Sequence, residues 1–284
     1  MRRVVAAVDL SGLRRRVADR ARIIAEEHGA ELALVHAIPQ LKDVFLSEAE
    51  VAAMKSVRGE STERLADWLR ARTDIDISIE LPVGPPARVV ARAGRDADVI
   101  VAGTSSLDPA SVGPMTRRIA RKSRSHLVAV RRQPRVPYRR VLVGVDLSTQ
   151  SRSAIGFALG LAPDSEVTVV YSLPVRFDTL LEESGFSEAE IASSRTRRIN
   201  EAKEALEAFT SPWRDRVRTL VMEGPPGQTI HEVVRRRSAD LAVVANRGAS
   251  ADSMVLLGTV AEEVLGSAPC DVAVANAGGV FRRP

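Results

Sequence analysis

The sequence predicts an α/β protein built from two similar doubly wound domains, each with a five-stranded parallel sheet. Three observations predict this fold: short motifs recur at a nearly constant offset, short apolar runs alternate with helical patterns, and a proline-containing segment without periodicity separates the two halves. Strands that alternate with helices favour a doubly wound parallel sheet, and the ligand crevice of such a sheet lies at the carboxyl ends of its strands.

The internal repeat runs along most of the chain. The motif VDLS at residues 8–11 recurs at residues 145–148, and the motif GPP at residues 84–86 recurs at residues 224–226. The offset grows from 137 to 140 residues between these two pairs. Such a small drift indicates one ancestral unit that has gained short loop insertions.

The repeat predicts two domains joined by a linker. They span residues 1–133 and 138–284, around the segment RQPRVPY at residues 132–138. The last strand of each half, at residues 127–130 and 272–275, would otherwise be an exposed apolar sheet edge. We therefore expect these two strands to pair, so that the domains form a pseudo-dimer within one chain. A homodimer of whole chains is left open.

Strands and helices are expected to alternate within each half. A spacing of two marks the half-exposed strands, short apolar runs mark the buried ones, and a 3.6-residue spacing marks the helices. The strands expected in the first half are residues 4–8, 31–36, 75–81, 99–102 and 127–130, and those in the second half are residues 141–145, 167–171, 218–222, 241–245 and 272–275.

The loop after residues 241–245 has the pattern of an anion site. It is bracketed by Gly248 and Gly258, and a helix is expected to begin at Gly258-Thr259. Free backbone N–H groups, the positive end of the helix dipole and the Thr259 hydroxyl would meet there. Glycine spacing alone is not specific, because loops after buried strands need glycine for ordinary steric reasons.

The loop resembles the nucleotide loop of the universal stress protein family, which reads G, two residues, G, nine residues, G, then S or T. This chain has Ala245, two residues, Gly248, nine residues, Gly258 and Thr259, so only the first glycine differs. The repeat extends the resemblance to both halves, and the protein resembles a tandem member of that family. The resemblance implies a Rossmann-like fold of the HUP or adenine nucleotide alpha hydrolase type, and ATP, ADP or AMP as ligand, with or without Mg²⁺.

The resemblance also implies which residues hold the ligand. Asp146 matches the family's aspartate that hydrogen-bonds adenine, Ser172 matches a residue of the base pocket, and the loop residues match those that hold ribose and phosphates. Two alternatives stay open: Asp146 can instead cap the next helix, and Arg247 can be a solvated loop residue. The implied residues are Gly144, Val145, Asp146, Ser172, Val244, Ala245, Arg247, Gly248, Gly258, Thr259 and Val260.

The first repeat does not keep the phosphate loop. Aligned from the last strand, Gly113 matches Gly258 and Pro114 matches Thr259, and the loop that follows Gly103 is three residues shorter. A proline there replaces both a hydroxyl and an N–H. We expect nucleotide in the second half alone.

Composition excludes several kinds of protein. Hydrophobic residues make up 45% and charged residues 27%, as in soluble globular proteins. The single cysteine, Cys270, excludes a disulfide framework and a cysteine-based zinc cage, and we expect it to be buried. The histidines show no metal-ligand spacing, and no apolar stretch approaches the ~18 residues of a membrane span. We expect a cytoplasmic protein with no metal site and no membrane partner.

Positive charge is concentrated in one segment. Residues 114–140 hold ten basic residues and no acidic one, while the net charge of the chain is +5. Such a segment attracts polyanions. However, no aromatic residue interleaves it before Tyr138, and no nucleic-acid-binding motif surrounds it. We expect its arginines to be solvated, and nucleic acid is not an expected partner.

The sequence indicates a binding protein more than an enzyme. It shows no Ser-His-Asp order, metal site or carboxylate pair, so we assign no catalytic residue. At equivalent strand positions, His36 and Tyr171 are expected to line the core or a pocket wall. Our first hypothesis is a stress-response or regulatory protein that binds ATP or a related nucleotide in its second half and acts on an unnamed protein partner. The alternatives are an interaction scaffold or binder of another small ligand, and a slow ATPase or phosphotransfer protein.

Overall fold

Strands and helices alternate twice in the same order, as the repeat predicts. The computed structural model describes residues 1–9, 14–38, 47–104, 112–173, 180–181, 183–246 and 257–276. The first half contains β1 (Arg3–Ala7), α1 (Arg14–His28), β2 (Glu31–Val35), α2 (Glu48–Arg70), β3 (Ile77–Glu80), α3 (Pro86–Ala93), η1 (Gly94–Asp96), β4 (Val99–Gly103), α4 (Pro114–Lys122) and β5 (His126–Val130). The second half contains β6 (Arg140–Val145), α5 (Thr149–Leu161), β7 (Glu166–Leu173), α7 (Glu188–Thr210), η2 (Ser211–Trp213), β8 (Val217–Glu223), α8 (Pro226–Arg237), β9 (Leu241–Ala245), α9 (Thr259–Ser267) and β10 (Asp271–Ala275).

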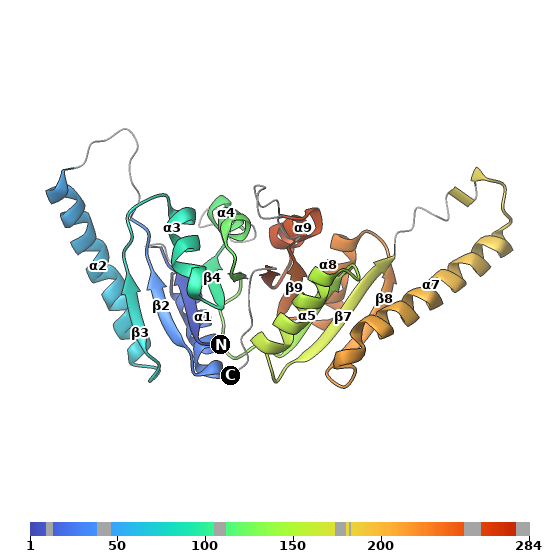
Figure 1. Cartoon of the computed structure of the whole chain (residues 1–284), viewed down its shortest axis with the longest axis horizontal. Helices are drawn as coiled ribbons and strands as arrows, with labels where there is room; N and C mark the ends of the chain where they lie inside the picture. Colours follow the sequence, from blue (N-terminus) through green and yellow to red (C-terminus); the bar gives the residue numbers. More distant parts are fainter. Residues whose placement is uncertain are drawn as a thin grey trace.

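The ten described strands form one continuous sheet in the order β3-β2-β1-β4-β5-β10-β9-β6-β7-β8 (Figure 1). Neighbouring strands within each half are parallel. At the centre, β5 and β10 run antiparallel, with Val128 opposite Ala273. The strand order of the second half is that of the first in reverse, which indicates a pseudo-two-fold axis between β5 and β10. The predicted parallel sheets and the predicted pairing of the fifth strands are both confirmed.

Two layers of helices cover this sheet. On one face, α1, α2, α5 and α7 form a core cluster that includes Val17, Leu65 and Ile155. On the other face, α3, α4, α8 and α9 form a cluster that includes Val90 and Val264. Both clusters contain residues of β5 and of β10, so each core layer is continuous across the boundary between the halves. Strands covered on both faces explain the near-continuous apolar runs in the sequence.

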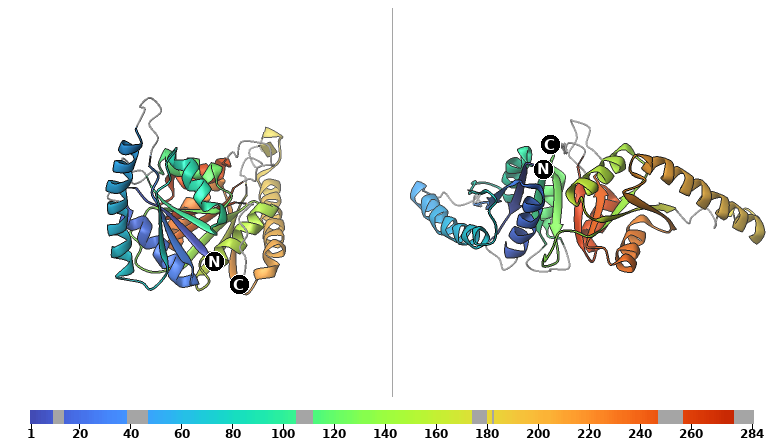
Figure 2. Two further views of the ribbon diagram at one scale, coloured as in Figure 1. Left: turned by 60° about the vertical axis from the view of Figure 1, so that its left-hand side comes forward. Right: turned by 90° about the horizontal axis from the view of Figure 1, so that it is seen from below.

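The long helices α2 and α7 lie at the two ends of the sheet (Figures 1 and 2). Both begin with the same capping box, in which Ser47 and Glu50, or Ser187 and Glu190, exchange hydrogen bonds between side chain and backbone. The motif SEAE encodes this start in both halves. Across the described ranges, no helix has the length and apolar character needed to cross a bilayer.

A buried carboxylate closes one side of the seam between the halves. Asp271 is 1% exposed and accepts hydrogen bonds from the N–H groups of Arg131 at 2.7 Å and Arg132 at 3.0 Å, and from the Tyr138 hydroxyl at 2.9 Å. The Arg20 guanidinium lies 3.4 Å from the same carboxylate and 3.9 Å from the centre of the Tyr138 ring. This cluster joins α1, the linker and β10.

Stacked rings close the opposite side of the seam. His126, at the start of β5, stacks on Phe157 of α5 with ring centres 3.9 Å apart. Its Nδ1 accepts a hydrogen bond from the Asn276 N–H at 3.2 Å. His126 and Asp271 begin the two fifth strands, so the same position carries a stacked ring in one half and a hydrogen-bonded carboxylate in the other.

Two details of this region go beyond the expectations. Tyr138, the last residue of the predicted linker, is buried and belongs to the core. Most arginines of the basic segment are exposed, as expected, but Arg131 donates to the Leu265 carbonyl at 2.6 Å and Arg121 forms an ion pair with Glu262 of α9. Each contact joins residues far apart in the chain, so no local pattern signals it.

Candidate functional site

A cavity of about 280 Å³ opens at the carboxyl edge of the second half, where β6, β7 and β9 end and α5, α8 and α9 begin. A doubly wound sheet places its ligand crevice at this edge. Of the eleven residues implied for the site, Arg247 and Gly248 lie outside the described residues. The other nine line the cavity: Gly144, Val145, Asp146, Ser172, Val244, Ala245, Gly258, Thr259 and Val260.

Hydrogen bonds hold Asp146 on a tight turn beside this cavity. Its Oδ1 accepts from the Ser151 hydroxyl at 2.5 Å and from the Ser148 N–H at 3.1 Å, and its own N–H donates to the Ser151 hydroxyl at 3.0 Å. The next residue, Leu147, has a φ of 61°, a left-handed conformation that is uncommon for a residue with a side chain. Asp146 is exposed, so a ligand in the cavity can reach its carboxylate.

The interpretation of Asp146 as a helix cap is wrong. Ser148 is the N-cap of α5, and its hydroxyl accepts from the Ser151 N–H at 3.2 Å. Asp146 lies two residues earlier and holds the turn that leads into the helix. Ser151 is 2% exposed and bonds both to the carboxylate and to the N–H of Asp146, so it positions the aspartate.

A second wall of the cavity comes from β6, β7 and α8. A Cβ atom at Gly144 would lie 2.6 Å from Cδ1 of Ile230, so any larger residue there would displace Ile230 from this wall. The Ser172 hydroxyl donates to the Gly224 carbonyl at 2.5 Å. Because that bond uses its one proton, Ser172 offers a ligand an acceptor.

The start of α9 directs backbone donors at the cavity. Gly258 is the N-cap and has no side chain with which to cap the helix. The first intrahelical bond runs from the Glu262 N–H to the Gly258 carbonyl at 2.8 Å, so the N–H groups of residues 259–261 have no intrahelical acceptor. All three residues line the cavity. With the positive end of the helix dipole, they make this wall suited to an anion.

Sequence reasoning missed part of the lining. Tyr171 was expected in a core or a pocket wall, and it lines the cavity. Three of the missed residues follow Asp146 within a few positions, so proximity in the chain was their signal. Two others come from α8, and only the rule that helices begin at the carboxyl edge of a parallel sheet points to them. The missed residues are Ser148, Gln150, Ser151, Val170, Pro226, Ile230 and Ala261.

In the first half, His36 takes the place of Tyr171 and is held by two hydrogen bonds. Its Nδ1 lies 2.9 Å from the Val8 carbonyl and its Nε2 lies 3.0 Å from the Arg58 guanidinium. A carbonyl only accepts and a guanidinium only donates, so Nδ1 carries the proton and His36 is neutral. At 4% exposure, this ring is part of the protein interior.

The helix that starts at this edge of the first half also differs. It begins at Pro114 with Gly113 as N-cap, which confirms the predicted match to Thr259 and Gly258. Proline has no N–H, so the first donor is missing. The Thr116 hydroxyl then donates to the Gly103 carbonyl at 2.7 Å. In the second half both equivalent residues are alanines, at 261 and 245, and both line the cavity.

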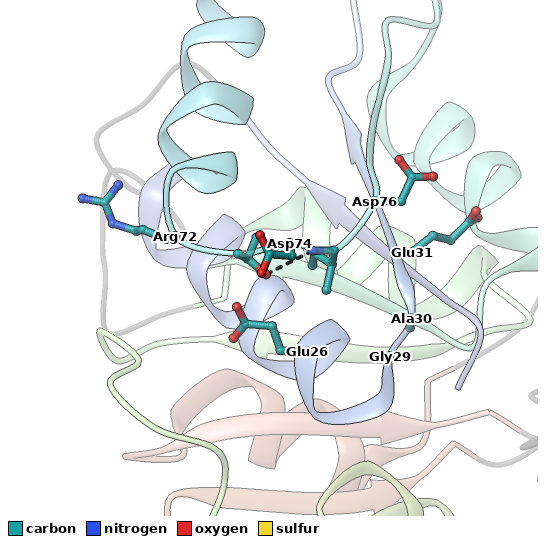
Figure 3. Close-up of a pocket in the computed structure, with 9 residues that line it drawn as sticks. Glu26, Gly29, Ala30, Glu31, Arg72, Asp74 and Asp76 are labelled. Atoms are coloured by element: carbon teal, nitrogen blue, oxygen red, sulfur yellow. Dashed lines mark hydrogen bonds between the residues drawn. The ribbon is translucent and has the colours of Figure 1, made fainter.

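A wider hollow lies at the opposite edge of the first half, around the turn before β3 (Figure 3). Carboxylates of Glu26, Glu31, Asp74 and Asp76 line it. Figure 3 shows Glu26 and Glu31 directed to different sides and Arg72 directed outward. These side chains do not converge on one point, so the hollow offers no ligand set.

Metal and thiol chemistry find no support in the described part of the chain. No group of three His, Cys, Asp or Glu side chains there is placed to hold a metal ion. Cys270 is buried, as expected, and burial raises the pKa of its thiol to about 12. A thiol with such a pKa stays protonated and inert near neutral pH.

Comparison with known proteins identifies the family. The sequence pattern of the Universal stress protein family matches residues 1–131 and again residues 137–276. The chain belongs to the universal stress protein family. Universal stress protein MJ0531 of Methanocaldococcus jannaschii is 30% identical over 139 residues, covering 48% of this chain and 81% of that protein. Universal stress protein Sll1388 of Synechocystis is 28% identical over 151 residues, covering 48% of this chain and 97% of that protein.

A solved universal stress protein shares the whole architecture. The crystal structure of a universal stress protein from Archaeoglobus fulgidus matches with a TM-score of 0.68 and 17% identity, covering 96% of this chain and 98% of that chain. At this identity the likeness shows the fold alone. The tandem arrangement of this universal stress protein follows from the two successive family matches along one chain.

Proposed function

We propose that this universal stress protein binds an adenine nucleotide, ATP, ADP or AMP, in the cavity of its second half, and acts as a cytoplasmic stress-response or regulatory protein. The observation that supports this most is the convergence of nine residues implied by the nucleotide-loop resemblance around one space. The volume of about 280 Å³ is near the lower end of the range for small-molecule sites, about 300 Å³.

Each wall of the cavity has its own role in this proposal. Asp146, held by Ser151, accepts a hydrogen bond from adenine. The N–H groups at the start of α9 and the Thr259 hydroxyl bind phosphate oxygens. The nucleotide-loop resemblance assigns Arg247 and Gly248 to the phosphates as well. Mg²⁺ enters only with the phosphates, because the described residues include no carboxylate cluster for it.

The proposal assigns the ligand to one half. In the unit of residues 138–284, Thr259 supplies a backbone donor and a hydroxyl. In the unit of residues 1–133, Pro114 supplies neither, and the Thr116 hydroxyl occupies the Gly103 carbonyl. The first half then serves as the structural partner that covers the β10 edge of the second.

Calorimetric titration of the full chain with ATP tests this function. We expect saturation at one equivalent per chain, and adenine absorbance in the supernatant after gentle denaturation of the purified protein. Two equal sites would contradict the assignment to the second half. Absence of binding by ATP, ADP and AMP would favour the scaffold hypothesis, and release of more than one equivalent of phosphate would favour a slow ATPase.

A further inference from the structure

A basic hollow of about 400 Å³ lies on the outer surface of the first half, where α3 and α4 pack side by side. It shares no residue with the nucleotide cavity. Arg88 and Arg92 of α3, Arg95 of η1 and Lys122 at the end of α4 surround it, and the buried Ala91 forms part of its lining. All four cationic side chains are exposed.

The described residues supply no counter-charge in the hollow. None of those that line it is acidic. None of the ion pairs among the described residues includes Arg88, Arg92, Arg95 or Lys122, whereas their neighbour Arg121 pairs with Glu262. Four like charges around one small volume repel one another, and the resulting positive potential attracts anions.

The second half shows that the fold does not require this charge. Gln228 replaces Arg88 there, Glu232 replaces Arg92 and Ser267 replaces Lys122, while Arg95 matches Arg235. Glu232 pairs with Arg236 of the same helix at 2.5 Å. The same backbone therefore carries three fewer cations at these positions in the second half than in the first.

Helix stabilisation does not account for all four cations. Arg92 and Lys122 lie in the last turns of α3 and α4, where positive charge favours the helix dipole. Arg95 lies in the last turn of η1, which directly continues α3, so a helix end also favours its charge. Arg88 lies in the first turn of α3, where positive charge opposes the dipole, so this arginine requires a different explanation.

We propose that this hollow binds a compact anion with several phosphoryl groups. Three guanidinium groups offer paired N–H donors that match phosphate oxygens, and Lys122 adds a point charge. Such an anion is either inorganic polyphosphate or the phosphate tail of a nucleotide. The inference is independent of the nucleotide cavity, because the two sites lie on different helices.

The test is calorimetric titration of the full chain with inorganic tripolyphosphate at low and at physiological salt. We expect saturable binding that weakens as salt rises. The double variant R88E/R95E should weaken it at least about tenfold, because two charge-assisted contacts become repulsive. Glutamate in the first turn of α3 favours its dipole, whereas Arg95 lies in the last turn of η1, so thermal unfolding of the variant serves as the folding check.

The matched control is R235E/R237E, which makes the same change in net charge on α8. Both residues are exposed, and binding should stay within about twofold of the unaltered chain, as expected when only distant screened charges change. A second titration with ATP distinguishes the two sources of the anion. If R88E/R95E weakens ATP binding, the hollow accepts the phosphate tail of a nucleotide. The variant R88E/R95E does not change the start of α9, where the nucleotide phosphates are proposed to bind. The two proposals can therefore fail separately.

Three results would overturn the proposal. The first is no saturable binding of tripolyphosphate. The second is an equal loss in R88E/R95E and R235E/R237E, which would mean that net charge alone attracts the anion. The third is hollow-dependent binding of a short single-stranded oligonucleotide that is far tighter than tripolyphosphate binding, which would make the surface part of a nucleic-acid interface.

Discussion

The carboxyl edges of the two halves share one backbone plan and differ in chemistry. In both, the helix before the last strand begins directly after a glycine N-cap, but α4 begins with Pro114 and α9 with Thr259. The Thr116 hydroxyl closes on the Gly103 carbonyl in the first half, whereas two alanines border an open cavity in the second. The comparison teaches that a duplicated fold can keep its sheet while the side chains at the edge of that sheet diverge.

The seam shows the same divergence at buried positions. Asp271 gathers two backbone N–H groups, a tyrosine hydroxyl and a guanidinium on one side of the pseudo-two-fold axis. On the other side, His126 stacks on Phe157. Removing the partner of a buried charge lowers stability strongly, whereas removing one of two stacked rings lowers it less. The charged side of the seam should therefore respond most strongly to mutation.

The largest expected effect is that of Asp271→Ala. It should lower the free energy of unfolding by about 3–5 kcal/mol, because the buried Arg20 and the Tyr138 hydroxyl lose their shared partner. Urea denaturation measures this loss. Asp240→Ala is the matched control: Asp240 also accepts from two backbone N–H groups, those of Arg139 and Arg140, but it is only partly buried. A loss for Asp271→Ala no larger than for Asp240→Ala would contradict the seam assignment.

The next effect concerns the nucleotide. Asp146→Ala should weaken ATP binding by about 1–3 kcal/mol, the cost of leaving a donor of the ligand without its acceptor. Asp9→Ala changes the equivalent residue of the first half and should leave the affinity unchanged. Calorimetric titration measures the ATP affinity of both variants, and thermal unfolding checks that both are folded. Equal weakening by the two substitutions would mean that both halves bind, and no change in either would remove Asp146 from the site.

Much of the fold was predictable because its signals are local. All ten strands appear at the expected positions to within two residues, since buried strands between helices are marked by apolar runs and turns. The internal repeat predicted the long-range strand pairing. A motif shared at residues 8–11 and 145–148 fixed which strands are equivalent, and a shared exposed edge then predicted the pairing of β5 with β10.

The side chains at the seam were not predictable in the same way. Arg131 belongs to the basic segment and Tyr138 to the predicted linker, and their partners Leu265 and Asp271 lie more than 130 residues away. The candidate site shows the same difference between local and long-range signals. Asp146 and Gly258 belong to sequence motifs, whereas Ile230 lines the cavity only because α8 packs against β6.

A smaller effect tests the contact between α4 and α9 across the seam. A double-mutant cycle of Arg121→Ala and Glu262→Ala should give a coupling below about 1 kcal/mol, because both side chains are partly exposed to solvent. The coupling should shrink further in high salt. At the pseudo-equivalent position, Arg117 approaches Gly266, so Arg117→Ala should show no coupling to Glu262→Ala. A coupling of several kcal/mol would mean that this ion pair organises the seam.

The smallest expected effect is a pH dependence of the seam at His28. Burial lowers the pKa of this histidine, and a hydrogen bond from its Nε2 to the Leu161 carbonyl, 3.2 Å away in the other half, only partly offsets that. Because the folded-state pKa lies below the unfolded value of about 6.5, folding favours the neutral ring. Its contribution is complete above about pH 6.5 and is lost as the pH falls through the folded-state pKa. The loss should stay well under about 1 kcal/mol, since the side chain is partly solvated.

Urea denaturation at pH 7, 6 and 5 measures this loss of stability. It should be smaller for His28→Gln, because glutamine keeps a donor for Leu161 and cannot titrate. His231→Gln, whose histidine also has its pKa lowered by burial but lies within the second half, separates the seam from a general effect. A measured His28 pKa above 6.5 would reverse the sign and place the loss of stability on the alkaline side.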